Sequence, residues 1–396
     1  MILEKDIVMG NMLVDMYVKC NMLRKAHEVL RKLPKRDVVT RTAVIGGYAH
    51  HGYGDVALKC FKQMRKEGIS PNEVTFICVL KACGITRSLK IGENVDLEIR
   101  KQGLMQKHVA LGTALVDMYL KCSALEKAQE VFEQLPVRNV VSWSAMINGY
   151  VQHGLGHEAL KCFREMQDAR VHPNAVTYAG ILKACGIIGA LEIGEGIDVE
   201  VRKQGLLEND VVLGTSLVDM YSKCGALEKA REVFEQLPHQ NVVTWSAMIT
   251  GYCQHGLGDQ ALECFREMQN AGIRPDAVTY VCILKACGIL GSLEVGEDID
   301  VEVRKQGLLQ KNVVLGTALV DMYAKCGALE KAQEVFEQLP ERNILSWSAL
   351  IAGYGQLGQA SVAFNVYTRM RTAKVLPNLV TFIVLLNVCS HAGLLE

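Results

Sequence analysis

The sequence repeats one eight-residue stretch three times, as Val-Val-Ser-Trp-Ser-Ala-Met-Ile at 140–147, Val-Val-Thr-Trp-Ser-Ala-Met-Ile at 242–249 and Ile-Leu-Ser-Trp-Ser-Ala-Leu-Ile at 344–351. The same slot one period earlier, at 38–45, reads Val-Val-Thr-Arg-Thr-Ala-Val-Ile. The three tryptophans of the chain all lie in this stretch, 102 residues apart. A fixed period is typical of a repeat protein, in which each unit packs on its neighbours instead of closing a core of its own.

Each period divides into three related units of 35, 36 and 31 residues. The 31-residue units lie at 7–37, 109–139, 211–241 and 313–343. The 35-residue units lie at 38–72, 140–174, 242–276 and 344–378, and the 36-residue units at 73–108, 175–210 and 277–312. Residues 1–6 match the end of a truncated 36-residue unit, and 379–396 match the beginning of another. This register assigns the chain without a gap or an overlap.

Each unit is expected to form two helices. In 211–241, one amphipathic stripe runs from Val212 to Tyr221 and a second from Ala226 to Phe234, and Gly225 between them is typical of a helix end. Proline closes the 31- and 35-residue units, at Pro34, Pro71, Pro136, Pro173, Pro238, Pro275, Pro340 and Pro377. We therefore predict an all-α fold, a right-handed superhelical α-solenoid of stacked helix-turn-helix repeats with a concave inner wall.

The composition argues against several kinds of site. No run of eighteen apolar residues exists, so no membrane span is expected. Most of the 14 cysteines recur with the repeat on apolar faces, and no CxxC pair occurs, so we expect buried, reduced thiols and no metal site. No nucleophile and base stand apart from the repeats, so we expect no catalytic residue, no cofactor and no small-molecule substrate. The net charge is zero, which weighs mildly against nucleic-acid binding.

Three stretches carry a family resemblance: Gly-Tyr-Val-Gln-His-Gly (149–154), Ala-Leu-Lys-Cys-Phe-Arg-Glu-Met (159–166) and Asp-Met-Tyr-Ser-Lys-Cys-Gly-Ala-Leu-Glu-Lys-Ala (219–230). Together with the alternation of three unit lengths, they resemble plant pentatricopeptide repeat (PPR) proteins of the PLS subclass. In that class the 35-, 36- and 31-residue units are called P, L and S. Tetratricopeptide arrays, which bind proteins, have 34-residue units but do not alternate in this way.

The resemblance implies that each repeat reads one base of single-stranded RNA, with the second residue of the unit forming the wall against which the base lies. Second positions are Val8, Val39, Val74, Ala110, Val141, Val176, Val212, Val243, Val278, Val314, Leu345 and Val380. Because residues two, five, nine and thirteen of a helix share one face, these aliphatic side chains are expected on the concave wall. The alternative is that they are ordinary core residues.

The resemblance assigns base selection to the fifth and last residues of each unit. In the P units these pairs are Thr42/Asn72, Ser144/Asn174, Ser246/Asp276 and Ser348/Asn378; in the S units they are Asn11/Asp37, Thr113/Asn139, Thr215/Asn241 and Thr317/Asn343. The family's pairing code then gives the target 5'-UAxAAxAGxAA-3'. The x positions belong to L units, whose pairs Ile77/His108, Ala179/Asp210 and Val281/Asn312 have an aliphatic fifth residue and should read weakly. The alternative for a last-position Asn or Asp is a helix N-cap of the following unit.

Two sets of lysines are candidates for contact with the RNA backbone. Lys19, Lys121, Lys223 and Lys325 fall at position thirteen of the S units, and Lys81, Lys183 and Lys285 at position nine of the L units. If they face the groove, they form a cationic ladder in a molecule that is neutral overall; otherwise they are solvated surface lysines. Four lysines at phosphates would give a log–log salt slope of about 3 for single strands.

The resemblance further implies the specificity array of an organellar C-to-U RNA-editing factor, with accessory editing factors docking at the L units, in a mitochondrion or chloroplast. The editing chemistry of that class needs a His-x-Glu and a Pro-Cys-x-x-Cys, and neither occurs here, so the chain itself is not expected to be an enzyme. No targeting peptide is recognised at Met1, and the register starts partway through a unit. The alternative function is a helical-repeat scaffold for protein–protein interaction.

Overall fold

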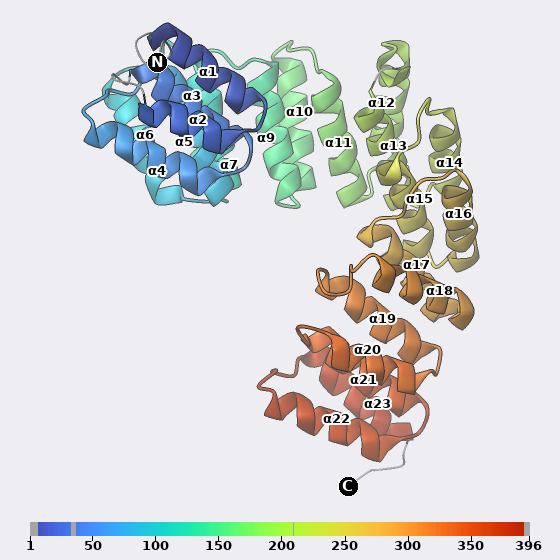
Figure 1. Cartoon of the computed structure of the whole chain (residues 1–396). Coiled ribbons are helices and arrows are strands. Elements are labelled where there is room, and N and C mark those ends of the chain that lie inside the picture. The colour runs from blue at the N-terminus through green and yellow to red at the C-terminus, as the bar shows by residue number, and fades with distance from the viewer. Residues whose placement is uncertain (1–6, 33–36, 209, 392–396) are drawn as a thin grey trace. The chain divides into compact units, whose positions relative to one another are not determined.

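The computed structural model describes residues 7–32, 37–208 and 210–391, and within them every regular element is a helix (Figure 1). The first helices of the hairpins are α1 (Ile7–Lys19), α3 (Val38–His50), α5 (Glu73–Thr86), α7 (Val109–Lys121), α9 (Val140–Gln152), α11 (Ala175–Ile188), α13 (Val211–Lys223), α15 (Val242–Gln254), α17 (Ala277–Leu290), α19 (Val313–Lys325), α21 (Ile344–Gln356) and α23 (Leu379–His391). The second helices are α2 (Leu23–Lys32), α4 (Gly54–Lys66), α6 (Leu89–Lys101), α8 (Leu125–Glu133), α10 (Gly156–Asp168), α12 (Leu191–Lys203), α14 (Leu227–Gln236), α16 (Gly258–Asn270), α18 (Leu293–Lys305), α20 (Leu329–Gln338) and α22 (Ala360–Thr372); a 3-10 turn, Leu206–Glu208, follows α12. The expected all-α fold of helix-turn-helix repeats is confirmed.

The chain forms two compact bodies, residues 1–188 and 189–396. In the first body α3 packs against α1 and α5, and α9 packs against α7 and α11. In the second body α13, α15, α17, α19, α21 and α23 form one continuous succession of packed first helices. First helices therefore make one layer of each body, with the second helices packed against it. Among the described residues, none of the helices has the length and apolar character needed to cross a membrane.

Most first helices of the described chain are capped by the last residue of the preceding unit, except α7, where His108 makes no side-chain cap bond. Oδ1 of Asn174 accepts hydrogen bonds from the backbone N and from Oγ1 of Thr177, both at 2.9 Å. Asp276 caps α17 in the same way through Thr279, at 2.8 Å for both bonds. The same backbone contact is made by Asp37, Asn72, Asn139, Asp210, Asn241, Asn312, Asn343 and Asn378. Each such cap contributes about 1 kcal/mol to helix stability.

The turn between the two helices of an S unit needs a residue in the left-handed region. Gly225 and Gly327 occupy this place with φ of 80° and 77°. Their counterparts Asn21 and Ser123 adopt φ of 56° and 59°, where a Cβ is unfavourable. The sequence prediction that Gly225 ends a helix is correct.

The repeated tryptophan lies in the core between an S unit and the P unit that follows. Trp143 is 2% exposed, and its ring meets Phe132 of α8 edge-on at 4.7 Å between centroids. Trp245 meets Phe234 and Trp347 meets Phe336 in the same geometry, each at 4.6 Å. An edge-to-face pair of this kind adds to the free energy gained by burying the two rings. The tryptophan thus fixes how successive hairpins stack.

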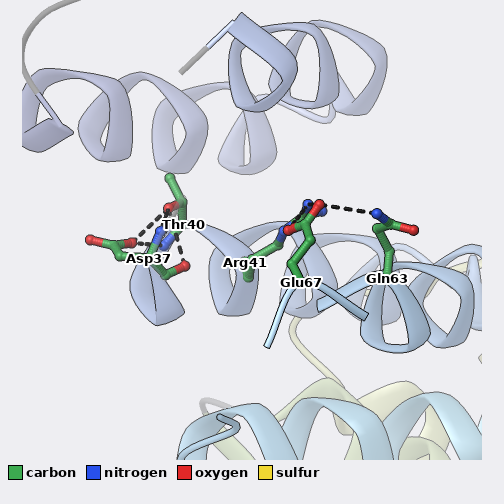
Figure 2. A network of polar contacts seen from close by, with 5 residues as sticks. All are labelled: Asp37, Thr40, Arg41, Gln63 and Glu67. Carbon is green, nitrogen blue, oxygen red and sulfur yellow. Dashed lines mark hydrogen bonds and ion pairs between the residues drawn. The ribbon is translucent and has the colours of Figure 1, made fainter. Parts of the chain in front are cut away.

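Arg41 replaces the tryptophan in the first P unit, and its partner changes with it. Its guanidinium is buried and bonds both carboxylate oxygens of Glu67, which also accepts from Nε2 of Gln63 at 3.1 Å (Figure 2). The residues that correspond to Glu67 in the three tryptophan-containing units are all alanine, at Ala169, Ala271 and Ala373. A buried cation needs a fixed anion beside it, whereas an indole does not. The two positions therefore change together.

A polar network recurs where an L unit meets the following S unit. The hydroxyl of Tyr119 in α7 donates to Asp96 of α6 at 2.7 Å, and Nε of Arg100 donates to the same carboxylate at 2.7 Å. Tyr221 and Asp198, and Tyr323 and Asp300, make the same bond at 2.9 Å. The aspartate in each case is nearly buried and satisfied by both partners. This network joins the second helix of an L unit to the first helix of the next unit.

The cysteines are free thiols that mostly lie within the packed layers. Burial raises the pKa of Cys83, Cys162 and Cys287 to about 12, so these side chains are neutral. Within the described residues, no group of three His, Cys, Asp or Glu side chains could hold a metal ion.

Candidate nucleic-acid interface

The second residues of the units form a row of exposed aliphatic side chains. Their exposed fractions lie between 49% for Val74 and 64% for Val212, and Ala110 is exposed as well. The set is Val39, Val74, Ala110, Val141, Val176, Val212, Val243, Val278, Val314, Leu345 and Val380; the side chain of Val8 lies outside the described residues. The alternative interpretation, that these are core valines, is therefore wrong. Exposed apolar surface often marks a binding site, so these side chains are a candidate interface, although exposed aliphatic side chains also occur on the second helices, as at Val199 and Val301.

The fifth and last residues of one S unit contact each other directly. Nδ2 of Asn343 donates to Oγ1 of Thr317 at 3.2 Å, while Oδ1 of Asn343 caps α21 by accepting from the backbone N of Ser346 at 2.9 Å. The corresponding threonines, Thr113 and Thr215, are half-buried like Thr317. The side chain of Asn11, the fifth residue of the first S unit, is outside the described residues.

In the second body, second, fifth and last residues of several units line a groove of about 370 Å³. Its walls come from the first helices α17, α19, α21 and α23. Second residues (Val314, Leu345, Val380), fifth residues (Val281, Thr317, Ser348), a last residue (Asn343) and ninth residues (Lys285, Asp321, Ala352) all line it. Residues recurring every unit thus converge on one open surface that is mostly apolar, with a few polar side chains.

The fifth residues of the P units are less accessible than the sequence led us to expect. Thr42, Ser144, Ser246 and Ser348 are only 5–8% exposed, and each lies between two hairpins. These hydroxyls are therefore not open to solvent, although the resemblance assigns the fifth residues to base selection. The physical reason is a threonine at the third position of the following L unit, which draws the hydroxyl into the interface.

Each P-unit hydroxyl is linked through that threonine to the last residue of its own unit. Oγ of Ser144 lies 2.7 Å from Oγ1 of Thr177, which donates its single hydrogen to Oδ1 of Asn174 at 2.9 Å. Ser144 must therefore donate to Thr177. The same links hold at Thr42–Thr75–Asn72 and Ser348–Thr381–Asn378. Oγ of Ser246 also lies 2.6 Å from Oγ1 of Thr279, which donates to Asp276, but Ser246 donates to the backbone O of Val242 at 2.7 Å. Fifth and last residues act as one network rather than as two independent side chains.

The cap leaves one atom of the last residue available. At Asn72, Asn174 and Asn378 only Oδ1 is used, so within the described part of the chain Nδ2 has no hydrogen-bond partner. At Asp276 the bonds use Oδ1, and Oδ2 has no hydrogen-bond partner among the residues that the structure describes. The capping role and a ligand-binding role are therefore compatible, and the free atom is a donor in asparagine and an acceptor in aspartate.

The L units have fewer hydrogen-bonding side chains at the fifth and last positions. Ile77 and Val281 are half-buried aliphatic side chains, and Ala179 is 8% exposed. Among their last residues, Asp210 and Asn312 are caps, but His108 makes no side-chain cap bond. In these units the fifth residue has no hydrogen-bonding group, and the last residue has the polar side chain of the pair.

Each S-unit lysine forms an ion pair with an aspartate of its own helix. Lys19 contacts Asp15, Lys121 contacts Asp117, Lys223 contacts Asp219 and Lys325 contacts Asp321, each at 2.7 Å and each within one helical turn. All four lysines at position thirteen are thus ion-paired, so they are not free members of a cationic ladder. Each of these lysines is neutralised locally by the ninth residue of its own unit.

The L-unit lysines carry the unpaired charge on this face. Lys81, Lys183 and Lys285 are exposed, and the salt bridges of the described residues include none of them. Lys81 lies 3.3 Å from Nδ1 of His50. At positions nine and thirteen, each L unit has one lysine and each S unit has one lysine and one aspartate. Each period of three units therefore has a net charge of +1 at these positions.

Models of known protein families match the repeats of this chain. A model of the PPR repeat family matches residues 36–84, 138–186, 240–288 and 342–391. A model of the PPR repeat matches residues 11–38, 215–242 and 317–344, so the two together match more than half of the chain. The chain belongs to the pentatricopeptide repeat family.

Pentatricopeptide relatives from Arabidopsis thaliana match almost the whole chain. A chloroplastic pentatricopeptide repeat-containing protein is 37% identical over 384 residues, which are 97% of this chain and 47% of the relative. A mitochondrial one is 35% identical over 385 residues, which are 97% of this chain and 55% of the relative. This pentatricopeptide array thus spans about half the length of the curated relatives that it matches.

A solved pentatricopeptide structure shares the fold. The crystal structure of the pentatricopeptide repeat protein PPR10 in complex with an 18-nucleotide psaJ RNA element has a TM-score of 0.77, covering 97% of this chain and 58% of that chain. The sequence identity is 19%, so the similarity concerns the arrangement of the helical hairpins.

Two sets of residues at this pentatricopeptide surface were missed in the sequence. The ninth-position aspartates could have been found, because Asp and Lys four residues apart on one helix face are neighbours. The third-position threonines Thr75, Thr177, Thr279 and Thr381 gave no such signal, since their contacts cross from one unit to the next.

Proposed function

We propose that this array binds single-stranded RNA, one base per repeat, with the target 5'-UAxAAxAGxAA-3', as the specificity array of an organellar C-to-U RNA-editing factor. The observation that carries the proposal is the groove along α17, α19, α21 and α23, where second, fifth and last residues of successive units line one surface. PPR10, a protein of the same fold, is known in complex with RNA, which supports the same ligand class here.

The exposed second residues suit the flat face of a base. Successive first helices present one aliphatic side chain each, as Val314, Leu345 and Val380 do along the groove. When a base lies between two such side chains, its apolar faces are removed from water, which favours binding without any hydrogen bond. The contact would favour all four bases alike, so these residues supply affinity and the polar positions supply selectivity.

The free atom of the last residue gives a physical reason for the selectivity. With Oδ1 committed to the cap, Asn174 offers the N–H of Nδ2, which matches the ring-nitrogen acceptor on the Watson–Crick edge of adenine. Asp276 offers the acceptor Oδ2, which matches the ring N–H and amino group of guanine. The proposed assignments of adenine to unit 140–174 and guanine to unit 242–276 follow from this difference.

The fifth residue has two different roles in this proposal. In the P units Ser144 and its counterparts orient the last residue through the intervening threonine, so they are positioning residues. In the S units the fifth side chain is more accessible, and Thr317 can present its hydroxyl beside Asn343. Both residues of an S-unit pair are therefore proposed to contact the base.

Backbone contact is proposed to come from lysines of both sets. Lys81, Lys183 and Lys285 are exposed and available to phosphates, whereas Lys19, Lys121, Lys223 and Lys325 must first leave an aspartate. Three phosphates contacted by the L-unit lysines correspond to a log–log salt slope of about 2 for single strands. This replaces the steeper slope expected from four free S-unit lysines.

The proposed location of the protein is an organelle. The matched relatives carry chloroplastic or mitochondrial names, which supports an organelle as the location. The weakly reading L units leave room for accessory editing factors as protein partners. The chain's own residues are proposed to address the RNA, not to perform the deamination.

Fluorescence anisotropy with the proposed RNA tests the function. The purified chain is titrated into a labelled 11-nucleotide RNA of the proposed target with uridine at each x, and into a scrambled RNA of equal composition. We expect the proposed RNA to bind at least tenfold more tightly than the scrambled one. Equal affinity for both would reject base-selective binding, and no binding to either would favour the protein-interaction scaffold.

A further inference from the structure

A carboxylate accompanies the lysine in every S unit, on the face proposed to meet RNA. In three S units the pair is Asp117–Lys121, Asp219–Lys223 and Asp321–Lys325, with Oδ2 and Nζ 2.7 Å apart each time. Asp321 lines the groove together with Lys285, Thr317 and Asn343. An acidic residue so placed acts against binding of a polyanion, and the proposed reading of bases does not need it.

The ion pair contributes little to folding. All six side chains are between 28% and 43% exposed, and an exposed pair one helical turn apart is weak because water and salt screen it. Tyr119, Met118 and Leu120 of the same helix are buried and hold α7 in place without it. The stability of the S unit therefore does not explain the aspartate.

The lysine stem is held in position, so only its charged end is free to change partner. A Cβ at Gly84 of α5 would lie 2.9 Å from Cδ of Lys121, and one at Gly288 of α17 would lie 3.1 Å from Cδ of Lys325. The stem thus packs closely over a glycine of the preceding L unit. Rotation of the outer bonds suffices to move Nζ from the carboxylate toward an approaching phosphate.

We infer that Asp117, Asp219 and Asp321 attenuate RNA binding by holding the S-unit lysines until a phosphate replaces the carboxylate. The inference rests on the proposed function. In the exchange, Nζ gives up the aspartate and gains a phosphate oxygen, and the aspartate is left facing the RNA backbone within the range of unscreened repulsion. The net attraction per S unit stays near zero, and the L-unit lysines supply most of the sequence-independent affinity.

The direct test removes the three carboxylates. The triple variant Asp117→Asn, Asp219→Asn and Asp321→Asn is titrated with the matched and the scrambled RNA at several salt concentrations. Because phosphates carry no sequence information, we expect both RNAs to bind about tenfold more tightly at low salt. The log–log salt slope should steepen by about 2 for three released lysines. Unchanged or weaker binding of both RNAs would overturn the inference.

A matched control separates a local effect from one of overall charge. Glu126, Glu228 and Glu330 are exposed carboxylates in the first turns of the second helices α8, α14 and α20. Changing these three to glutamine alters the net charge by the same amount. We expect affinity and salt slope to stay within twofold of the wild type; a gain equal to that of the aspartate variant would overturn the inference.

A double-mutant cycle asks whether the aspartates act through the lysines. Lys121, Lys223 and Lys325 are changed to alanine in the wild-type and in the triple-aspartate background. We expect the gain from removing the aspartates to fall by more than half when the lysines are absent. An undiminished gain would overturn the exchange of partners. Failure of the wild type itself to bind either RNA would instead reject the proposed function, so the two failures are distinguishable.

Discussion

The amide nitrogen of Asn343 donates a hydrogen bond to the hydroxyl of Thr317 over 3.2 Å, although 26 residues separate them in the chain. One is the last and the other the fifth residue of the same repeat. Their side chains meet because Asn343 caps the next hairpin while Thr317 faces it from α19. Two hydrogen-bonded polar side chains at the edge of a groove can both bind the same group of a ligand.

The last residue can be exchanged without loss of its cap, which gives a clean test of selectivity. In Asp276→Asn the free atom changes from an acceptor to a donor, while Oδ1 still caps α17. We expect the preference at the eighth base to move from guanine to adenine, by about tenfold, as one matched contact is exchanged for another. Anisotropy with RNAs that differ only at this base measures the change.

The reciprocal change is the control. Asn174→Asp in unit 140–174 should move the preference at the fifth base from adenine to guanine and leave the eighth base unaffected. Substituting Ser246 itself is less informative, because this residue is 7% exposed and hydrogen-bonded to Thr279, so a larger side chain would disturb the packing. If both swaps leave every base preference unchanged, the last residues do not read bases.

The exposed second residues should matter for binding and not for folding. Val314→Ala removes a 63% exposed side chain, so the free energy of unfolding should change by less than about 0.5 kcal/mol. We expect weaker binding of matched and scrambled RNA by a similar factor. Val301→Ala, a 51% exposed position on α18, serves as the control and should bind normally. Equal effects of the two variants would contradict the stacking role.

The pairing of Arg41 with Glu67 predicts a compensating double substitution. Arg41→Ala leaves the carboxylate of Glu67 without its cation and should lower the free energy of unfolding by about 3 kcal/mol. Arg41→Trp combined with Glu67→Ala reproduces the residues of the other three P units and should restore that stability or exceed it. Urea unfolding of the two variants provides the comparison, and a double variant less stable than Arg41→Ala would show that this repeat cannot accept the indole.

Alkaline pH should destabilise the fold through its buried thiols. Burial raises the pKa of Cys83, Cys162, Cys253, Cys264 and Cys287 to about 12, above the ordinary value of 9.0. The folded state holds these protons more tightly, so their contribution is present below pH 9 and is lost as the pH rises toward 12. Urea midpoints measured at increasing pH should therefore fall from about pH 9 upward. A midpoint that stays constant to pH 11 would contradict this.

The sequence predicted what depends on spacing along the chain. The unit register, the two helices of each unit and the exposed valines all follow from residues recurring at fixed positions, such as Val212 and Gly225. The burial of Ser144 was not predictable in this way, because it depends on Thr177 of the next unit. The pairing of Lys121 with Asp117 could be predicted from their four-residue spacing. Its effect on the charge of the groove could not, because the sequence alone does not show which helix face lines the groove.

Selection from a random RNA pool with the purified chain tests the central idea most directly, since it presupposes no code. If each repeat reads one base, the enriched sequences fit UAxAAxAGxAA, with adenine or guanine at the P- and S-unit positions after the first uracil and little preference at the three L-unit positions. A pool that remains random after repeated rounds, or a motif whose period does not follow the repeats, would contradict it.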